Sequence, residues 1–241
     1  MKYENIVKGF FISRPNRFIA NVTINGEEHR VHVKNTGRCK ELLEKGNMVY
    51  LEDFTGRMGT RKMTYSLINV VKNYCNHSKN MLINMDSQAP NKVVKEALLG
   101  ASILLPGMDQ LTIVKAEQKY KNSRFDFYVE DINGKKAFIE VKGVTLEKDG
   151  IAYFPDAPTA RGTKHLHQLI DALTEGYGAY VILVIQIEDI NLFRPNKDTD
   201  PAFAESIKMA SKNGVKILAY NCNVTEDTLA IANKMDIELD W

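Results

Sequence analysis

The stretch that decides the fold is SRFDFYVEDINGKKAFIEVKG, which covers residues 123–143. It holds two runs with apolar residues at alternate positions, joined by a short polar connection centred on Asn133. Side chains alternate between the two faces of a strand, so this pattern predicts a β-hairpin. Asp126, Glu140 and Lys142 interrupt the otherwise apolar strands, and their presence needs a physical reason.

The register of this hairpin decides whether its polar residues meet. An odd loop centred on Asn133 sets Asp126 opposite Glu140, whereas a two-residue turn at Asn133-Gly134 would point Asp126 away from Glu140. The apolar residues favour the odd loop, because only that register keeps the apolar side chains of both strands on one face. These side chains are Phe125, Phe127, Val129, Ala137, Ile139 and Val141. We therefore predict that the polar residues lie on the opposite face, away from the core.

Two carboxylates in direct opposition destabilise a pair of strands, and one of them tends to hold a proton. A divalent cation between Asp126 and Glu140 would remove this repulsion. Mg²⁺ is commonly held by one or two carboxylates together with water and phosphate oxygens, and Mn²⁺ takes similar ligands. Lys142 lies on the same face as Glu140, where it can contact a scissile phosphate. The pattern indicates metal-assisted phosphodiester chemistry, and the alternative is a solvated polar face with ordinary ion pairs.

The composition of the whole chain is that of an ordinary soluble protein. Its 241 residues are 44% hydrophobic and 26% charged, which allows one large domain or two smaller ones. The net charge is only +2, so any basic surface for nucleic acid must be local. Three scattered cysteines without a C-x-x-C pair disfavour a disulfide framework or a zinc ribbon. With no secretory signal pattern and no long apolar run, we expect a cytoplasmic protein without a membrane span.

The pattern of the sequence changes near residue 87. Residues 1–86 hold short β-rich runs, with a hairpin turn at Asn25-Gly26, and they predict a small OB-type barrel that binds nucleic acid. Residues 87–241 predict a helix over 91–105, three strands, and then alternating helices and strands. The continuous apolar run 179–187 predicts a central strand covered by helices on both faces. The second domain is therefore an α/β domain with a mixed sheet.

Further basic, polar and aromatic residues are candidate contacts for nucleic acid. Loops of the first domain supply charge for phosphates and rings for base stacking through Arg14, Arg17, Phe18, Arg38, Arg61 and Lys62, with Tyr65 as another ring. The second domain supplies Arg124, Arg161, His165 and Gln168. Arg161 lies in the first turn of a predicted helix, where backbone N–H groups favour phosphate. The alternatives are a core position for Phe18, plain surface charge for the arginines and a partly exposed position for His165.

Several longer motifs carry a resemblance to a known family. They are RPNRF (14–18), NTGRCKELL (35–43), PNKVVKEAL (90–98), SRFDF (123–127), IEVKGVTL (139–146), FPDAPTARGTKHLHQL (154–169) and DPAF (200–203). Together they resemble the sugar fermentation stimulation protein family over nearly the whole chain, and the D…E-x-K strands resemble the PD-(D/E)xK nuclease superfamily. The resemblance implies an OB-like barrel in 1–86, a nuclease-like α/β domain in 87–241, and DNA binding.

The resemblance also implies roles for particular residues. Asp126 and Glu140 would hold Mg²⁺ or Mn²⁺, and Lys142 would be the catalytic lysine. A further glutamate that the superfamily often carries on the preceding helix would be Glu96, with Glu117 as its rival. The leading proline-aspartate pair of the superfamily is not matched, because Ser-Arg-Phe precedes Asp126.

The resemblance leaves the activity of the chain open. One alternative is a DNA-binding regulator of sugar metabolism that does not cut, and another is an RNA-processing enzyme with the same site. The sequence leaves undecided whether DNA is bound as one strand or two, whether RNA is bound, and whether the chain forms a homodimer.

Overall fold

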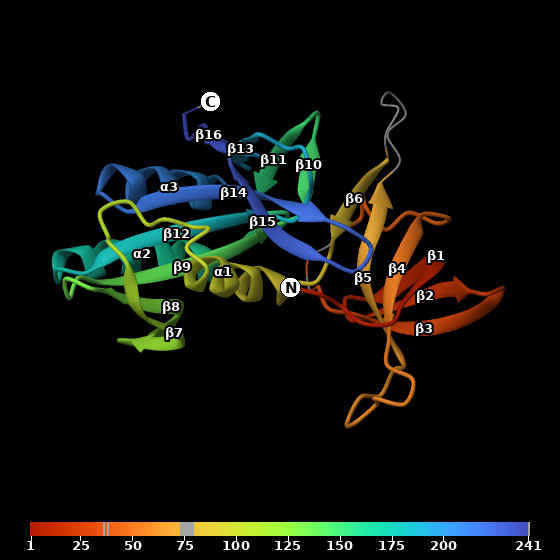
Figure 1. The fold of residues 1–241 in the computed structure, drawn as a ribbon. Coiled ribbons are helices and arrows are strands. Elements are labelled where there is room, and N and C mark those ends of the chain that lie inside the picture. The colour runs from red at the N-terminus through yellow and green to blue at the C-terminus, as the bar shows by residue number, and fades with distance from the viewer. Residues whose placement is uncertain (36, 38, 73–79, 241) are drawn as a thin grey trace.

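The computed structural model describes residues 1–35, 37, 39–72 and 80–240, which form two lobes (Figure 1). The first lobe, red to orange in Figure 1, consists of strands. The second lobe, yellow to blue, surrounds its main sheet with helices. A barrel followed by an α/β domain with a mixed sheet is the architecture that the sequence predicts.

The first lobe is a closed barrel. Five strands form its ring: β1 (Ile6–Asn16), β2 (Ile19–Ile24), β3 (Glu27–Val33), β4 (Met48–Asp53) and β5 (Tyr65–Lys72). A sixth strand, β6 (Met81–Asn84), pairs with β5 outside the ring. The strands follow the order β3-β2-β1-β4-β5-β6, and parallel pairing of β3 with β5 closes the barrel. Asn25 and Gly26 both have positive φ, 50° and 87°, as a two-residue hairpin turn of type I′ requires. The predicted hairpin turn is confirmed.

The main sheet of the second lobe is mixed, as predicted. It contains β7 (Leu111–Tyr120), β8 (Ser123–Asp131), β9 (Lys136–Val144), β12 (Gly178–Ile185), β14 (Lys216–Val224) and β15 (Leu229–Lys234), in the order β15-β14-β12-β9-β8-β7. Strand β12 runs parallel to both β9 and β14, whereas β8 is antiparallel to β7 and β9. The apolar run 179–187 therefore supplies the central strand, as its pattern predicts.

Helices cover both faces of this sheet. They are α1 (Ala89–Leu99), α2 (Ala160–Thr174) and α3 (Pro201–Lys212). Alternate residues of β12 divide between two clusters: Tyr180 and Ile182 pack with α1, whereas Val181 and Leu183 pack with α2 and α3. The helix expected over 91–105 is too long, because the chain leaves the helix at Gly100 and turns.

The sequence does not predict a smaller sheet, whose strands come from three separate parts of the chain. This sheet consists of β10 (Leu146–Lys148), β11 (Ile151–Phe154), β13 (Leu192–Pro195) and β16 (Asp236–Ile237). These strands are too short for alternation to stand out in the sequence.

The barrel packs against the carboxyl ends of the central strands. The amide of Asn84 donates to the carbonyl of Gln186 at 3.0 Å, just beyond β12. The ammonium of Lys72 lies 2.7 Å from the buried Glu147 carboxylate, just beyond β9. Ligands of α/β proteins bind preferentially at these strand ends, so the lobes meet where a site is expected.

Candidate metal and nucleic-acid site

The hairpin of β8 and β9 has the predicted odd loop. Phe127 pairs with Ile139 and Val129 with Ala137, which centres the loop on Asn133. This register brings the Asp126 carboxylate to strand β9, beside Glu140.

Asp126 is fixed by two hydrogen bonds from different elements. The Val141 amide donates to Asp126 Oδ2 at 2.7 Å, and Asn91 Nδ2 in α1 donates to Oδ1 at 2.8 Å. Burial and the negative charge of Glu140 raise the pKa of Asp126 above its ordinary value, against the effect of these two hydrogen bonds. The effect of Glu140 on the pKa of Asp126 is in the direction that the predicted register implies.

Glu140 is buried, with only 3% of its surface exposed. Its Oε1 atom accepts from Lys142 Nζ and contacts His165 Nδ1, each at 2.5 Å. Its Oε2 atom is buried and has no hydrogen-bond partner among the described residues. Burial alone would raise the pKa of Glu140, but the hydrogen bonds and charges of His165 and Lys142 hold it below its ordinary value.

The prediction that the polar residues lie away from the core is wrong, because a second core cluster lies on their face. Helix α2 covers this face and brings His165 onto Glu140. Phe125 also lies on the α2 side of the sheet, and not on the face that carries Phe127. Its ring is edge to face with the His165 ring, with 6.0 Å between the centroids. The strand alternation changes at Asp126, where the regular β8–β9 pairing ends.

Gly143 brings the first turn of α1 close to the end of β9. A β-carbon on Gly143 would lie 2.7 Å from Pro90 Cγ and 2.6 Å from Gln186 Oε1. Only a residue without a side chain allows this approach. The close contact sets Asn91, the next residue in α1, within reach of Asp126.

Helix α2 contributes both exposed and buried candidates. Arg161 and Lys164 are exposed in its first turns, whereas His165 and Gln168 are buried. Gln168 donates to Asn122 Oδ1 at 2.8 Å and so ties the β7–β8 turn to the helix. Their burial leaves His165 and Gln168 little surface for direct contact with DNA.

Neither candidate for the additional glutamate reaches the carboxylate pair. The Glu96 carboxylate, 60% exposed, pairs with the amino group of Met1 at 2.7 Å. Glu117 pairs with Arg124 at 3.2 Å on the surface. The residue of α1 that does contact the pair is Asn91.

The basic candidates of the barrel differ in their surroundings. Arg14 donates to the carbonyls of Gly37, Arg17 and Asn35, so it ties backbone segments together. Arg61 stacks on Phe54, with its guanidinium carbon 3.5 Å from the ring centroid. Arg17, Phe18 and Lys62 are exposed, which excludes the core position considered for Phe18, and Tyr65 is half-buried. Arg38 lies outside the described residues.

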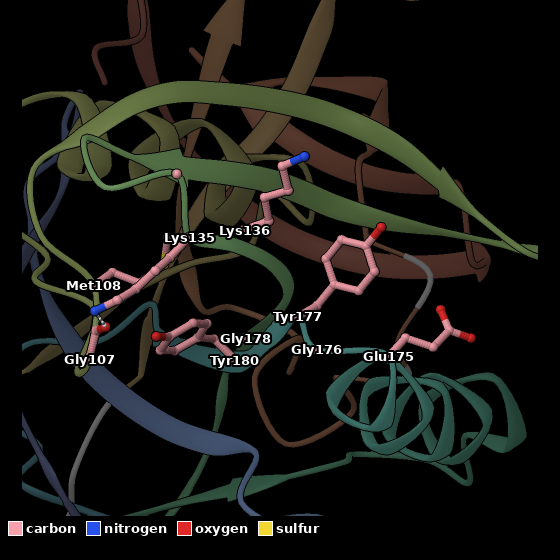
Figure 2. Close-up of a pocket in the computed structure, with 10 residues that line it drawn as sticks. Gly107, Met108, Lys135, Lys136, Glu175, Gly176, Tyr177, Gly178 and Tyr180 are labelled. Atoms are coloured by element: carbon pink, nitrogen blue, oxygen red, sulfur yellow. Dashed lines mark hydrogen bonds between the residues drawn. The ribbon is translucent and has the colours of Figure 1, made fainter.

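A hollow of about 410 Å³ lies at the opposite end of β9, and Figure 2 shows its lining. Lys135, Lys136, Tyr177 and Tyr180 line it together with glycines, and Lys135 Nζ donates to the Gly107 carbonyl at 2.8 Å. None of the residues that the sequence singles out lines this hollow.

The sequence reading misses Asn91. An asparagine at the start of a helix is usually read as a cap, so the residue itself gives no signal of a contact 35 residues away. The signal that could have identified Asn91 is its position directly after Pro90, in the first turn of α1.

Fold and site together define a class of protein: an OB-type barrel joined to an α/β domain that carries an acidic pair and a lysine on a hairpin of its mixed sheet. The acidic and basic residues of the motif stand on neighbouring strands in this domain.

The family follows from comparison with known proteins. The family models "SfsA N-terminal OB domain" and "Sugar fermentation stimulation protein RE domain" match residues 12–84 and 88–228. The chain belongs to the sugar fermentation stimulation protein family.

Relatives resemble the chain over its whole length. The sugar fermentation stimulation protein homolog of Clostridium beijerinckii is 53% identical, covering 99% of this chain and 100% of the relative. That of Desulfitobacterium hafniense is 51% identical, covering 99% of each chain. The solved structure of Pyrococcus furiosus SfsA in complex with Ca²⁺ is 26% identical with a TM-score of 0.84, covering 99% of this chain and 98% of that one. In the described part of the chain, no helix is long and apolar enough to cross a membrane.

Proposed function

We propose that this chain binds DNA and carries a phosphodiesterase site that depends on Mg²⁺ or Mn²⁺. The single observation that carries the proposal is the buried Glu140 carboxylate beside Asp126, with Oε2 left without a partner among the described residues. A buried carboxylate oxygen without a partner is unfavourable in a structural ion pair, and a cation ligand accounts for it.

The donor set fits a hard divalent cation. Asp126 and Glu140 offer carboxylate oxygens, which Mg²⁺, Mn²⁺ and Ca²⁺ all accept. The Ca²⁺ complex of the Pyrococcus furiosus relative supports a cation of this class. When bound, the cation would supply Lewis-acid stabilisation of charge on a phosphate.

The remaining residues of the site orient the two carboxylates and balance their charge. His165 and Lys142 fix one oxygen of Glu140, which keeps the other oxygen directed to a ligand. Asn91 orients Asp126. The Lys142 ammonium, which is partly exposed, is available to a phosphate oxygen and would offset negative charge that develops there.

The contacts that would hold DNA are the exposed basic residues. In the second domain these are Arg124, Arg161 and Lys164, and in the barrel Arg17 and Lys62 with the ring of Phe18. We set the domain boundary between residues 86 and 87, where the barrel strands end and helix α1 is about to begin.

A DNA-binding regulator that does not cut is the second candidate. It is favoured by the small number of ligands: within the described ranges, no three His, Cys, Asp or Glu side chains gather as a metal site. In this case the carboxylate pair would serve binding or shape alone.

The experiment is cleavage of labelled single-stranded DNA, duplex DNA and RNA with Mg²⁺ or Mn²⁺. Wild type runs beside Glu140→Ala, Glu96→Ala and an EDTA control. We expect cutting that disappears with Glu140→Ala and with EDTA and persists in Glu96→Ala. Binding of DNA without cutting by wild type would favour the regulator, and cutting that survives Glu140→Ala would exclude the proposed site.

A further inference from the structure

The barrel meets the second lobe near the ends of β9 and α2 through the segment that follows β3, of which Asn35, Gly37 and residues 39–43 are described. The Thr145 hydroxyl hydrogen-bonds to the Cys39 thiol, and Thr145 lies directly after β9. A β-carbon on Gly37 would lie 2.5 Å from Asp156 Oδ2, just ahead of α2. This segment of the barrel therefore borders the ends of the two elements that carry the proposed active site, β9 with Glu140 and α2 with His165.

Arg14 joins the same segment to the turn between β1 and β2. Its guanidinium donates to the carbonyls of Asn35 at 2.6 Å and Gly37 at 2.9 Å, and also to that of Arg17 at 2.9 Å. The Val33 amide donates to the Phe18 carbonyl at 2.8 Å. The β1–β2 turn and the barrel segment that follows β3 are thus held together.

The β1–β2 turn presents an aromatic ring beside a cation. Phe18 is 47% exposed, and the guanidinium carbon of Arg17 lies 5.1 Å from its ring centroid. A ring of this kind stacks on an unpaired base while the neighbouring cation binds phosphate. A continuous duplex offers no free base face, because its bases stack on one another.

We propose that the nucleic acid that this site takes is single-stranded DNA. One base stacks on Phe18, and the same strand crosses the barrel segment at Asn35 and Gly37 to bring a phosphate to Glu140 and Lys142. The proposal rests on the function proposed above for the location of the scissile phosphate. The two lobes then act on one strand, the barrel by holding it and the second lobe by cutting it.

The first test measures binding alone. Fluorescence anisotropy with labelled oligo(dT) and with a duplex of equal length is run in EDTA, so that cutting plays no part. We expect tighter binding of the single strand, and a loss of about 10-fold in Phe18→Ala for the single strand only. Phe10→Ala is the matched control, because Phe10 is 48% exposed with Lys8 at 5.8 Å from its ring centroid. Equal losses in the two variants, or a duplex bound as tightly as the single strand, would overturn the proposal.

The second test asks whether one strand makes both contacts. Affinity of wild type should rise at least about 10-fold as oligo(dT) grows from 4 to 12 nucleotides, within the site sizes of OB folds. Phe18→Ala should remove most of this rise. An equal loss for short and long oligonucleotides would show that Phe18 acts by itself, against the continuous route.

The two proposals fail in different ways. Single-strand binding that depends on Phe18, together with no cutting, would contradict the phosphodiesterase and leave the binding route standing. Cutting of duplex and single strand at equal rates, unchanged by Phe18→Ala, would contradict the route and leave the phosphodiesterase standing.

Discussion

Two buried glutamates on consecutive strands of the chain, Glu140 and Glu147, differ in the hydrogen bonds that their oxygens make. Both lie beside a lysine, Lys142 and Lys72 respectively. Glu147 Oε2 accepts from Lys72 Nζ and Oε1 accepts from the Gly150 amide at 2.6 Å, so both oxygens are satisfied. Glu140 has Lys142 and His165 on one oxygen and no described partner on the other. Burial is therefore common to both glutamates, and the carboxylate oxygen without a described partner is what distinguishes Glu140.

The largest expected effect separates the two glutamates by activity. Glu140→Gln should slow cutting by on the order of 10³-fold, because it removes a negative ligand from the proposed cation site. Glu147→Gln should leave the rate per folded molecule within about 3-fold, because its carboxylate has no role at the phosphate. Single-turnover cleavage with Mg²⁺ measures both rates. Equal losses in the two variants would break the comparison.

The second effect separates them by stability. Glu147→Ala leaves the Lys72 ammonium without its carboxylate at the interface of the lobes, and should lower the free energy of unfolding by about 3 kcal/mol. Urea denaturation followed by circular dichroism gives this value. Lys72→Met combined with Glu147→Met should recover most of the loss, since an apolar pair needs no compensation. A double variant as unstable as Glu147→Ala would speak against the ion pair.

The third effect tests whether His165 positions Glu140 rather than DNA. His165→Asn should slow cutting by about 10- to 100-fold, as is typical for partners of metal ligands. DNA affinity in EDTA should stay unchanged, because His165 is buried. His167→Ala, an exposed change on the same helix, is the control for both measurements. A parallel loss of affinity and rate in His165→Asn would assign the residue to DNA contact.

The smallest effect extends the comparison to Asp131, a third carboxylate, whose oxygens accept hydrogen bonds as those of Glu147 do. The Asp109 amide donates to Asp131, and the amides of Asn133 and Lys135 do so as well. These hydrogen bonds, that of Asp109 first, hold the pKa of Asp131 below its ordinary value of 3.8. The stability that they supply is present above that value and is lost as pH falls through the lowered pKa.

Asp131→Asn should therefore be less stable than wild type near neutral pH, with a gap that narrows below about pH 4. Urea denaturation at several pH values between 3 and 6 checks this expectation. Parallel stability curves for the two proteins would show that Asp131 is not held as an anion.

Much of the hairpin could be predicted because its signals are local. Strand alternation and a single shared apolar face fix the odd loop centred on Asn133, and a continuous apolar run identifies the central strand β12. The turn at Asn25-Gly26 could likewise be predicted, because the positive φ angles of this turn depend on local backbone geometry alone.

The surroundings of the site could not be predicted in the same way. Alternation shows which residues of β8 and β9 share a face from Phe127 onward, but it misplaces Phe125 and does not reveal that α2 covers the polar face. Whether Glu140 or Glu147 keeps a free oxygen depends on Lys72, His165 and Gly150, which come from three separate parts of the chain. Asn91 reaches Asp126 only because α1 packs on the end of β9.

The absence of a side chain at Gly143 has a consequence for the orientation of Asp126. The gap between α1 and β9 is smaller than a methyl group at this point, so Gly143→Ala would push Pro90 away and carry Asn91 with it. The orientation of the Asp126 carboxylate therefore depends on the distance between the backbones of α1 and β9. A homologue or design that widens this spacing by a few tenths of an ångström would keep every polar residue of the site and still misdirect the Asp126 carboxylate.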